Sequence, residues 1–422
     1  MARLRVVIVG GGFGGLACAR ALDGKPVDVK LIDQQNYHLF TPLLYQVATG
    51  LLNPSEIAYP LRKVFRRSRN VRVLQGEVGG IDLDRRMVRL RSGVDVPFDR
   101  LVLATGSTND YFGNQALARH TIGMKRLEEA VRLRNHVLAC LERAAQATDP
   151  KELRSWLTFV VVGGGPTGVE YAGALRELLR LVLGRDYPEL RLDQSRILLV
   201  EGRDRLLSQF ADPLGEYARR ILVERGIEVR LSRLVRSADE EAVTLSTGEV
   251  IPARTVVWAA GVRPVHPDDD SGVPTPRGRI EVDEQLRVRG LDGVFAIGDT
   301  AASEGGTGAD LPMLSPPAMQ AGRYVARVIA NEARERRESV EPFRYWDKGT
   351  MATIGRNSAV AQVGRLRLRG FVGWVAWLTV HLYYLIGFRN RAAVLWSWSW
   401  YYLREDRAIR VIVRSQRDPL IE

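Results

Sequence analysis

Cysteine is nearly absent from this sequence. Its 422 residues include only Cys18 and Cys140, and neither has a partner at C-x-x-C spacing. A redox-active dithiol and a cysteine-based zinc site are therefore not expected, and no other metal-ligand cluster is evident. Cys18 falls in an alanine-rich segment behind a glycine cluster, where a small buried hydrophobe is the expected role. This cysteine usage suits a reducing compartment such as the cytosol.

Low-complexity tracts are also missing. An apolar content of 45% and a charged content of 26% are those of a folded globular protein. The length is sufficient for two or three domains. The first expected strand begins almost at the N-terminus, which leaves no room for a cleavable signal or transit peptide.

The chain carries a formal net charge of +12, yet no recognised nucleic-acid-binding module accompanies it. From residue 344 to the end, thirteen basic residues outnumber five acidic ones, so this region holds most of the excess. Tryptophans are interleaved with these charges. The pattern predicts contact with an anionic membrane surface and no nucleic-acid partner.

A β-branched run feeds directly into a glycine cluster at the start of the chain. Gly10, Gly12 and Gly15 fall at G-x-G-x-x-G spacing between an expected strand and an expected helix. The first glycine permits a sharp turn, the second lets a pyrophosphate approach the backbone, and the third lets helix and strand pack closely. A second strand, 27–33, ends in Asp33, where a ribose hydroxyl should lie. Strand, glycines, helix, strand and acid together predict a dinucleotide site.

The same motif occurs a second time. Gly163, Gly165 and Gly168 repeat the spacing after a buried strand, and a later strand ends in Glu201. The interval between glycines and acid exceeds the ideal, so an inserted loop at 183–194 is expected. Two dinucleotide sites imply two dinucleotides, one a tightly held flavin and the other a nicotinamide.

Further segments match between the two halves. Residues 101–106 and 256–261 are both buried strands that end in small residues, at Gly106 and Gly261. Residues 293–300 form another buried strand, which ends in Gly298 and Asp299. Beside a flavin, Asp299 could bond the sugar-alcohol chain; alone, it would be a turn or N-cap acid.

Other segments support the same organisation. Residues 36–45 are aromatic-rich and are either a packed loop or a wall around a flat cofactor ring. Helices are expected at 125–146, at 213–224 and from about Pro317. Residues 265–279 are rich in proline and aspartate and should form a surface connection.

Two later segments are more specific. They are Phe-Arg-Tyr-Trp-Asp-Lys-Gly-Thr-Met-Ala-Thr-Ile-Gly-Arg at 343–356 and His-Leu-Tyr-Tyr-Leu-Ile-Gly-Phe-Arg-Asn-Arg at 381–391. With the two glycine motifs, they make nearly the whole chain resemble the flavoproteins that carry two dinucleotide-binding domains. Within that group it resembles the type II NADH dehydrogenases, which are single-subunit, non-pumping NADH:quinone oxidoreductases.

The resemblance implies an α/β fold with two Rossmann-like domains of the glutathione-reductase type, followed by a C-terminal amphipathic helical membrane-binding region. The implied FAD-binding domain comprises residues 1–117 and 270–345. The NADH-binding domain comprises 118–269, and the membrane-association region comprises 346–422. The implied function is hydride transfer from NADH to FAD and then two-electron transfer to a membrane quinone, menaquinone or ubiquinone.

The resemblance also carries over site residues. The positions matching FAD contacts are Gly10, Gly12, Phe13, Gly15, Asp33, Gly106, Gly298, Asp299 and Gln320. Those matching NADH contacts are Gly163, Gly165, Gly168, Glu170, Glu201 and Gly261. The candidate catalytic residues are Glu170, Gln320 and Lys348. Glu170 and Lys348 are the ionisable candidates for proton transfer or orientation, although Lys348 could instead be a solvated charge or pair with Asp347.

One position departs from the family pattern. The family often carries two glutamines four residues apart beside the flavin, whereas here Pro316 replaces the first and only Gln320 is present. Sulfide:quinone and disulfide reductases share the fold but need cysteines at the flavin. Soluble-acceptor reductases would leave the basic, tryptophan-rich C-terminus without a role. A membrane-surface flavin redox sensor without turnover is the non-enzyme alternative.

Two finer expectations concern partners. Glu201 should favour NADH over NADPH, because a carboxylate accepts from a ribose 2′-hydroxyl and repels a 2′-phosphate. Residues 371–388 would form an 18-residue helix of roughly 27 Å, short of a ~30 Å hydrocarbon core and diluted by His381 and two tyrosines. We therefore expect a peripheral protein on the cytoplasmic side of the cell membrane. A homodimer interface is the alternative for the aromatic region.

Overall fold

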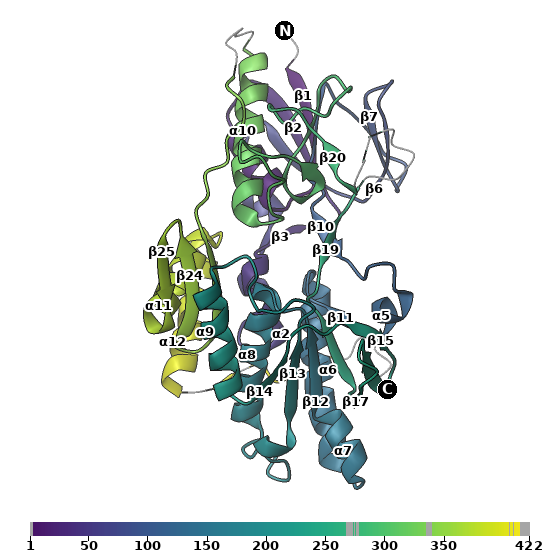
Figure 1. Cartoon of the computed structure of the whole chain (residues 1–422). Coiled ribbons are helices and arrows are strands. Elements are labelled where there is room, and N and C mark those ends of the chain that lie inside the picture. The colour runs from purple at the N-terminus through teal and green to yellow at the C-terminus, as the bar shows by residue number, and fades with distance from the viewer. Residues whose placement is uncertain are drawn as a thin grey trace. The chain divides into compact units, whose positions relative to one another are not determined.

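A computed structural model describes residues 3–266, 273, 275, 278–334, 340–404, 406–407 and 409–413. The chain divides into two compact units (Figure 1). The first comprises Met1–Leu39, Ala58–Thr108 and Val262–Lys348, and the second comprises Phe40–Ile57, Asn109–Gly261 and Gly349–Glu422. Most of the 265–279 connection and five C-terminal charged residues lie outside the described residues, namely Glu405, Arg414, Arg417, Asp418 and Glu422.

The first unit is built on a five-stranded parallel sheet in the order β21-β9-β1-β2-β5. Its strands are β1 (Leu4–Val9), β2 (Val27–Asp33), β5 (Val71–Gln75), β9 (Arg100–Leu103) and β21 (Val294–Ala296). The apolar side chains of β1 and β9 are almost completely buried, as parallel strands covered on both faces require. Helices α1 (Phe13–Leu22) and α10 (Ser315–Glu332) touch, because a Cβ on Gly322 would overlap the backbone of Gly14.

The second unit repeats this arrangement with the sheet order β11-β18-β12-β13-β14. Its strands are β11 (Ile122–Gly123), β12 (Thr158–Val162), β13 (Arg196–Val200), β14 (Ile227–Arg230) and β18 (Thr255–Trp258), and its main helices are α6 (Leu127–Gln146), α8 (Pro166–Val182) and α9 (Asp212–Glu224). β18 beside β12 corresponds to β9 beside β1, and the order of the next two strands also matches. The predicted α/β class with two Rossmann-like domains is confirmed.

Each unit also contains an antiparallel β-meander and several shorter elements. The meanders are β6 (Val78–Asp82), β7 (Met87–Leu90), β8 (Asp95–Pro97), and β15 (Val235–Ala238), β16 (Ala242–Leu245), β17 (Val250–Pro252). The shorter elements are β4 (Ala58–Pro60), α4 (Leu61–Val64), β10 (Ser107–Asn109), α5 (Gln115–His120), α7 (Pro150–Trp156), η2 (Leu192–Gln194), β19 (Val262–Pro264), β20 (Ile280–Glu281), η5 (Gly298–Thr300) and β22 (Ala301–Ala302). The expected inserted loop at 183–194 is present and ends in η2.

The aromatic segment 36–45 is not a loop. It forms β3 (Tyr37–Leu39), the 3₁₀ turn η1 (Thr41–Leu43) and the start of α2 (Leu44–Ala48), which leads towards α3 (Pro54–Ile57). Tyr45 and Leu44 are buried, because α2 packs between α6 and α8 in the second unit. The aromatic residues of this segment therefore indicate a helix that packs into the core of the second unit.

The C-terminal region differs from the expected all-helical plate in two ways. It begins with a three-stranded antiparallel sheet that was not predicted, β23 (Thr350–Gly355), β24 (Ser358–Val363) and β25 (Leu366–Arg369). The predicted helix over 371–388 is wrong in its length, because α11 (Gly370–Tyr384) stops at Leu385, whose backbone is extended. Gly387 has φ +88°, a left-handed conformation that ends the turn before α12 (Phe388–Arg404) begins. Among the described residues, no helix combines the length and the apolar character that crossing a membrane requires.

Candidate functional site

The first glycine motif forms an open cradle at the N-terminus of α1. A Cβ on Gly10 or Gly15 would overlap the neighbouring backbone, so the turn and the strand–helix contact both depend on glycine. A Cβ on Gly12 would instead meet nothing within 4 Å, and Gly12 makes no side-chain cap for α1. Open space therefore lies beside Gly12 at the N-terminus of α1, where a pyrophosphate can approach the helix.

Asp33 at the end of β2 completes this cradle. Its Oδ2 accepts a hydrogen bond from Gly11 N at 2.5 Å, and its Oδ1 accepts from Gln35 N at 2.7 Å. Burial raises the pKa of this carboxyl, and the two backbone donors oppose that shift. A carboxylate has about four acceptor positions, so capacity for a ribose diol is retained.

The second motif reproduces the first closely. A Cβ on Gly163 or Gly168 would overlap neighbouring backbone, whereas one on Gly165 at the N-terminus of α8 would meet nothing within 4 Å. Glu201 accepts from Gly164 N at 2.5 Å and from Arg203 N at 2.7 Å, as Asp33 does in the first unit. Both sets of residues fit an adenine dinucleotide.

Further predicted flavin residues gather in the first unit. Ser107, next to Gly106, donates to Asp299 Oδ2 at 2.5 Å, and both Gly106 and Gly298 have positive φ. Asp299 thus belongs to a small polar cluster at the carboxyl ends of β9 and β21. Phe13 begins α1, and its ring meets that of His38 edge-on with centroids 4.9 Å apart.

His38 was missed by sequence analysis. Its Nδ1 lies 3.0 Å from Gly11 O, and the ring is buried, which lowers its pKa to about 4. The neutral imidazole can donate from Nδ1 to that carbonyl, so His38 holds the carbonyl of Gly11 while Asp33 holds its amide. Only the fold brings this histidine back to the turn, and no spacing rule indicates it.

Gly261, the remaining predicted NADH contact, lies just after β18. Its carbonyl accepts from Asp110 N at 3.0 Å, and a Cβ there would press against the Phe112 ring. The indole of Trp258 donates to Asp110 O at 2.7 Å. These contacts hold the backbone after β18 close to the Gly163 turn, as the 104–106 backbone lies against the Gly10 turn in the first unit.

Glu170 is buried one turn into α8, with only 8% of its surface exposed. Its Oε1 accepts from Thr353 N on β23 at 3.2 Å. The Trp377 indole lies near the carboxyl and lowers its pKa slightly, although no hydrogen bond of good geometry joins them. Burial dominates and raises the pKa of Glu170 to about 8, so the carboxyl is mainly protonated at neutral pH.

Gln320 and Lys348 both contact Trp346 in the first unit. The Gln320 side chain donates to Trp346 O at 2.9 Å and accepts from Trp346 N at 3.0 Å. The Lys348 ammonium lies over the Trp346 ring, 5.4 Å from its centroid. Pro316 occupies the first turn of α10, one turn before Gln320. The structure therefore brings these two candidates together, while Glu170 belongs to the second unit.

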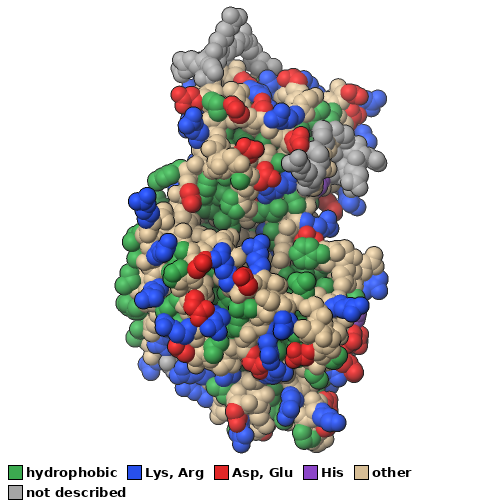
Figure 2. All heavy atoms as spheres, in the orientation of Figure 1, with side chains coloured by type: hydrophobic (Ala, Val, Ile, Leu, Met, Phe, Trp, Pro, Cys, Tyr) green, Lys and Arg blue, Asp and Glu red, His purple; other side chains and the backbone are tan. Residues whose placement is uncertain are grey.

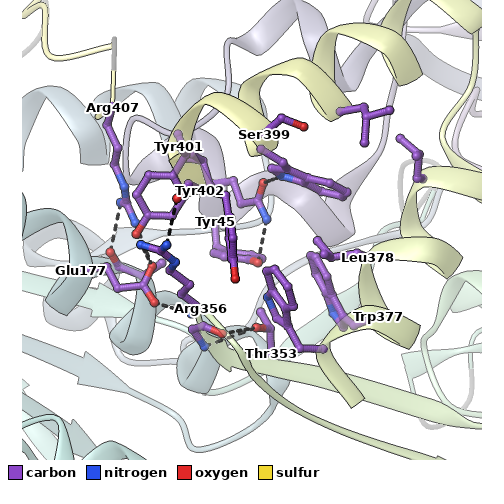
Figure 3. Close-up of a pocket in the computed structure, with 18 of the residues that line it drawn as sticks. Tyr45, Glu177, Thr353, Arg356, Trp377, Leu378, Ser399, Tyr401, Tyr402 and Arg407 are labelled. Atoms are coloured by element: carbon purple, nitrogen blue, oxygen red, sulfur yellow. Dashed lines mark hydrogen bonds and ion pairs between the residues drawn. The ribbon is translucent and has the colours of Figure 1, made fainter. Parts of the chain in front are cut away.

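A cavity of about 440 Å³ lies beside Glu170 in the second unit (Figure 3). Its lining includes both residues that contact Glu170, namely Thr353 and Trp377, and it also includes Tyr45. The wall is largely aromatic and aliphatic: Leu51, Trp374, Leu378, Leu382, Leu395, Trp398, Tyr401, Tyr402 and Leu403. Such a lining suits a flat, largely apolar ligand.

The cavity wall is held by contacts between distant segments. Trp398 Nε1 donates to Gln46 Oε1 at 2.8 Å, and Gln46 Nε2 donates to the Tyr45 hydroxyl at 2.8 Å. The Trp377 ring is stacked on His381 with centroids 4.0 Å apart. Burial lowers the pKa of His381 to about 4, so this ring is neutral at physiological pH.

Comparison with known proteins agrees with this geometry. Residues 4–322 match the pyridine nucleotide-disulphide oxidoreductase family. The chain is 40% identical to the type II NADH:quinone oxidoreductase Ndh of Mycobacterium tuberculosis over 427 residues, covering 98% of this chain and 91% of that one. It is also 40% identical to NdhA of the same organism, covering 94% and 86%.

A solved structure shows the same fold. NDH2 of Plasmodium falciparum in complex with NADH superposes with a TM-score of 0.89 at 19% identity, over 98% of this chain and 100% of that one. The predicted resemblance is confirmed by these matches. The chain belongs to the pyridine nucleotide-disulphide oxidoreductase family and, within it, to the type II NADH:quinone oxidoreductases.

Proposed function

We propose that this protein oxidises NADH and passes two electrons through FAD to a membrane quinone without pumping protons. The observation that carries the proposal is the pair of matching open cradles, each with an acid that accepts two backbone amides, in a chain 40% identical to type II NADH:quinone oxidoreductases. Bound FAD would accept a hydride from the nicotinamide and deliver electrons to the quinone.

The residues assigned to each dinucleotide follow the two units. Gly10, Gly12, Gly15 and Asp33 would hold the FAD adenosine and pyrophosphate, with Phe13, Gly106, Gly298, Asp299 and Gln320 at its other contacts. Gly163, Gly165, Gly168, Glu170, Glu201 and Gly261 would serve NADH. The domain boundaries 1–117 with 270–345, 118–269 and 346–422 are proposed with these assignments.

Glu170 is the strongest candidate for handling protons. A quinone needs two protons as it takes up two electrons, and a carboxyl that is protonated near pH 7 can release one from its own oxygen. The raised pKa of about 8 comes from burial among Trp377, Thr353 and their neighbours. Gln320 and Lys348 are proposed as further catalytic residues within the first unit, with Trp346 holding both side chains in place.

The cavity beside Glu170 is proposed to receive the quinone ring. Its aromatic walls can stack on a flat ring, and about 440 Å³ is in the range of small-ligand pockets. Menaquinone and ubiquinone both match this chemistry. Within the cavity, the Tyr45 hydroxyl is a proposed hydrogen-bond partner for a quinone carbonyl.

We also propose that α11 and α12 lie on the membrane. Figure 2 shows hydrophobic side chains gathered over these helices and bordered by basic ones. Several large apolar residues there are strongly exposed: Phe371, Val372, Tyr383, Phe388, Trp396 and Leu403. Tryptophan and tyrosine favour the headgroup level, and arginines bind anionic lipid. We propose a peripheral location on the cytoplasmic side of the membrane, with pairing of two chains through part of this face as the alternative.

Steady-state turnover tests the proposal directly. The FAD-loaded protein should oxidise NADH continuously when a soluble short-chain quinone is supplied. A redox sensor would be reduced once by NADH and then stop. Turnover with soluble one-electron acceptors but none with any quinone would instead identify a soluble-acceptor reductase and refute the quinone assignment.

A further inference from the structure

Glu177 is the centre of a charged cluster at one end of the cavity (Figure 3). It lies two turns after Glu170 on the same face of α8. Its Oε2 accepts from the Tyr401 hydroxyl at 2.9 Å and from Arg407 Nη2 at 3.2 Å, while its Oε1 accepts from Arg225 Nη1 at 3.1 Å and from Arg356 N. One carboxylate thus joins α8, α12 and the chain after β23.

Arg407, which follows α12, is buried to an unusual degree. Only 1% of its side chain is exposed. Besides the ion pair with Glu177, its Nη1 donates to Thr49 O at 2.9 Å and to Ala174 O at 3.1 Å, and its guanidinium lies 5.1 Å from the Tyr401 ring centroid. Its Nε has no partner among the described residues. Arg407 therefore ties α12 to α8 and to the end of α2.

The chain after Arg407 continues along the same surface. A Cβ on Gly50 would lie 2.7 Å from Ile409 O, so the tail passes directly over the end of α2. Val413 O accepts from Asn135 Nδ2 on α6 at 2.7 Å. The tail is therefore anchored to α6 and to the end of α2, the helix that supplies Tyr45 and Gln46 to the cavity.

The cost of burying this cluster indicates a positioning role. A buried ion pair adds little net stability compared with a well-packed apolar pair, because removing two charges from water costs free energy. Stability alone therefore does not explain why Glu177 and Arg407 are paired here. Here both partners line the cavity, Glu177 on α8 and Arg407 behind α12. Both helices supply lining residues, so a displacement of α12 relative to α8 would change the shape of the cavity.

We infer that Arg407, through Glu177, is a positioning residue that holds α12 at the distance from α8 that fits the electron acceptor. This rests on the proposed function, because it takes the cavity to be the quinone site. Without the ion pair between Arg407 and Glu177, α12 and its cavity residues Trp398 and Tyr402 would shift, and binding of the acceptor would weaken. Binding of FAD and NADH would not change.

The test compares Arg407→Met with Arg410→Met in the full-length, FAD-loaded protein. Arg410 lies three residues later in the same tail, but it is 30% exposed and pairs with Asp186 and Asp406, away from the cavity lining. In Arg407→Met the KM for a short-chain quinone should rise on the order of tenfold, the size expected for a lost charge-assisted hydrogen bond. The KM for NADH and the rate with ferricyanide, which needs no cavity, should be unchanged, and Arg410→Met should match wild type.

Two results would overturn the inference. The first is an unchanged quinone KM in Arg407→Met, even if its melting temperature falls, because that identifies Arg407 as structural only. If Arg407→Met does not retain FAD, Arg407→Lys replaces it in the test, because lysine keeps the charge but cannot contact Thr49, Ala174 and Glu177 together. A wild-type quinone KM in Arg407→Lys is the second contrary result. Absence of quinone turnover in wild type would instead refute the proposed function itself.

Discussion

Replacing Glu170 by glutamine should flatten the pH dependence of stability. In the folded protein the pKa of this carboxyl is raised from 4.5 to about 8 by burial. Between those values the folded state therefore binds more protons at this site than the unfolded state does. The free energy of unfolding must then fall as pH rises through this interval, because stability increases with pH only where the unfolded state holds more protons.

The size of this effect follows from the shift. Each pKa unit corresponds to 1.36 kcal/mol, so ionisation of Glu170 should remove roughly 3 to 4 kcal/mol of stability between pH 5 and pH 8. Glutamine has nearly the same shape, carries no charge and can still accept from Thr353 N. Glu170→Gln should match wild type near pH 5 and become progressively more stable than wild type towards pH 8 and above.

The assay is denaturant unfolding of the FAD-loaded proteins at intervals from pH 5 to pH 9. Glu224→Gln is the matched control, because its side chain is 60% exposed on α9. Asp33 titrates equally in all three proteins and cancels when variant and wild-type curves are subtracted. Parallel curves for wild type and Glu170→Gln would show that Glu170 is ionised throughout, and the proton-donor role would then be refuted. The variant should also retain FAD while its quinone turnover near pH 7 falls.

Three further predictions use other parts of the structure. Glu201→Gln should narrow the NADH-over-NADPH ratio of kcat/KM by roughly tenfold, because repulsion of the 2′-phosphate is lost; comparable values for both coenzymes in wild type would contradict this. Gly165→Val should fold and retain FAD but raise the KM for NADH on the order of tenfold or more, since a Cβ at this position meets no protein atom within 4 Å and the side chain would occupy the space left for the pyrophosphate. Serine at both Phe388 and Trp396, which are 88% and 68% exposed, should weaken co-sedimentation with anionic vesicles while Val94→Ser, on the first unit, should not; equal binding by both variants would exclude α12 as a membrane contact.

The dinucleotide cradles could be predicted from the sequence because their information is local. A glycine turn needs small residues at fixed spacing. Asp33 ends β2 and Glu201 directly follows β13, and each of these strands lies next to the strand that leads into the glycines. In the structure each acid accepts the amide of the residue between the first two motif glycines, Gly11 or Gly164, at the same distance. Duplicate local patterns thus specified duplicate local geometry, and the fold class followed from their repetition.

The C-terminal region shows where local patterns were insufficient. Hydrophobic content over 371–388 is compatible with one helix, and the break after Tyr384 depends on an extended Leu385 and a left-handed Gly387. A glycine permits that conformation but does not require it. The three strands before α11 were missed because β23 is stabilised by packing on α8, far away in the sequence.

Only the tertiary structure decided the properties of the cavity. Its lining is drawn from α2, α8, β23, α11, α12 and the tail at Arg407, so no sequence spacing could have indicated Glu177 or Arg407. The raised pKa of Glu170 has the same origin, since a carboxyl one turn into a helix becomes a proton donor only when other segments bury it. The sequence by itself determined which cofactors the protein can hold, because short-range backbone geometry forms those sites. The acceptor site was determined by long-range packing, because burial and charge pairing exist only once distant segments meet.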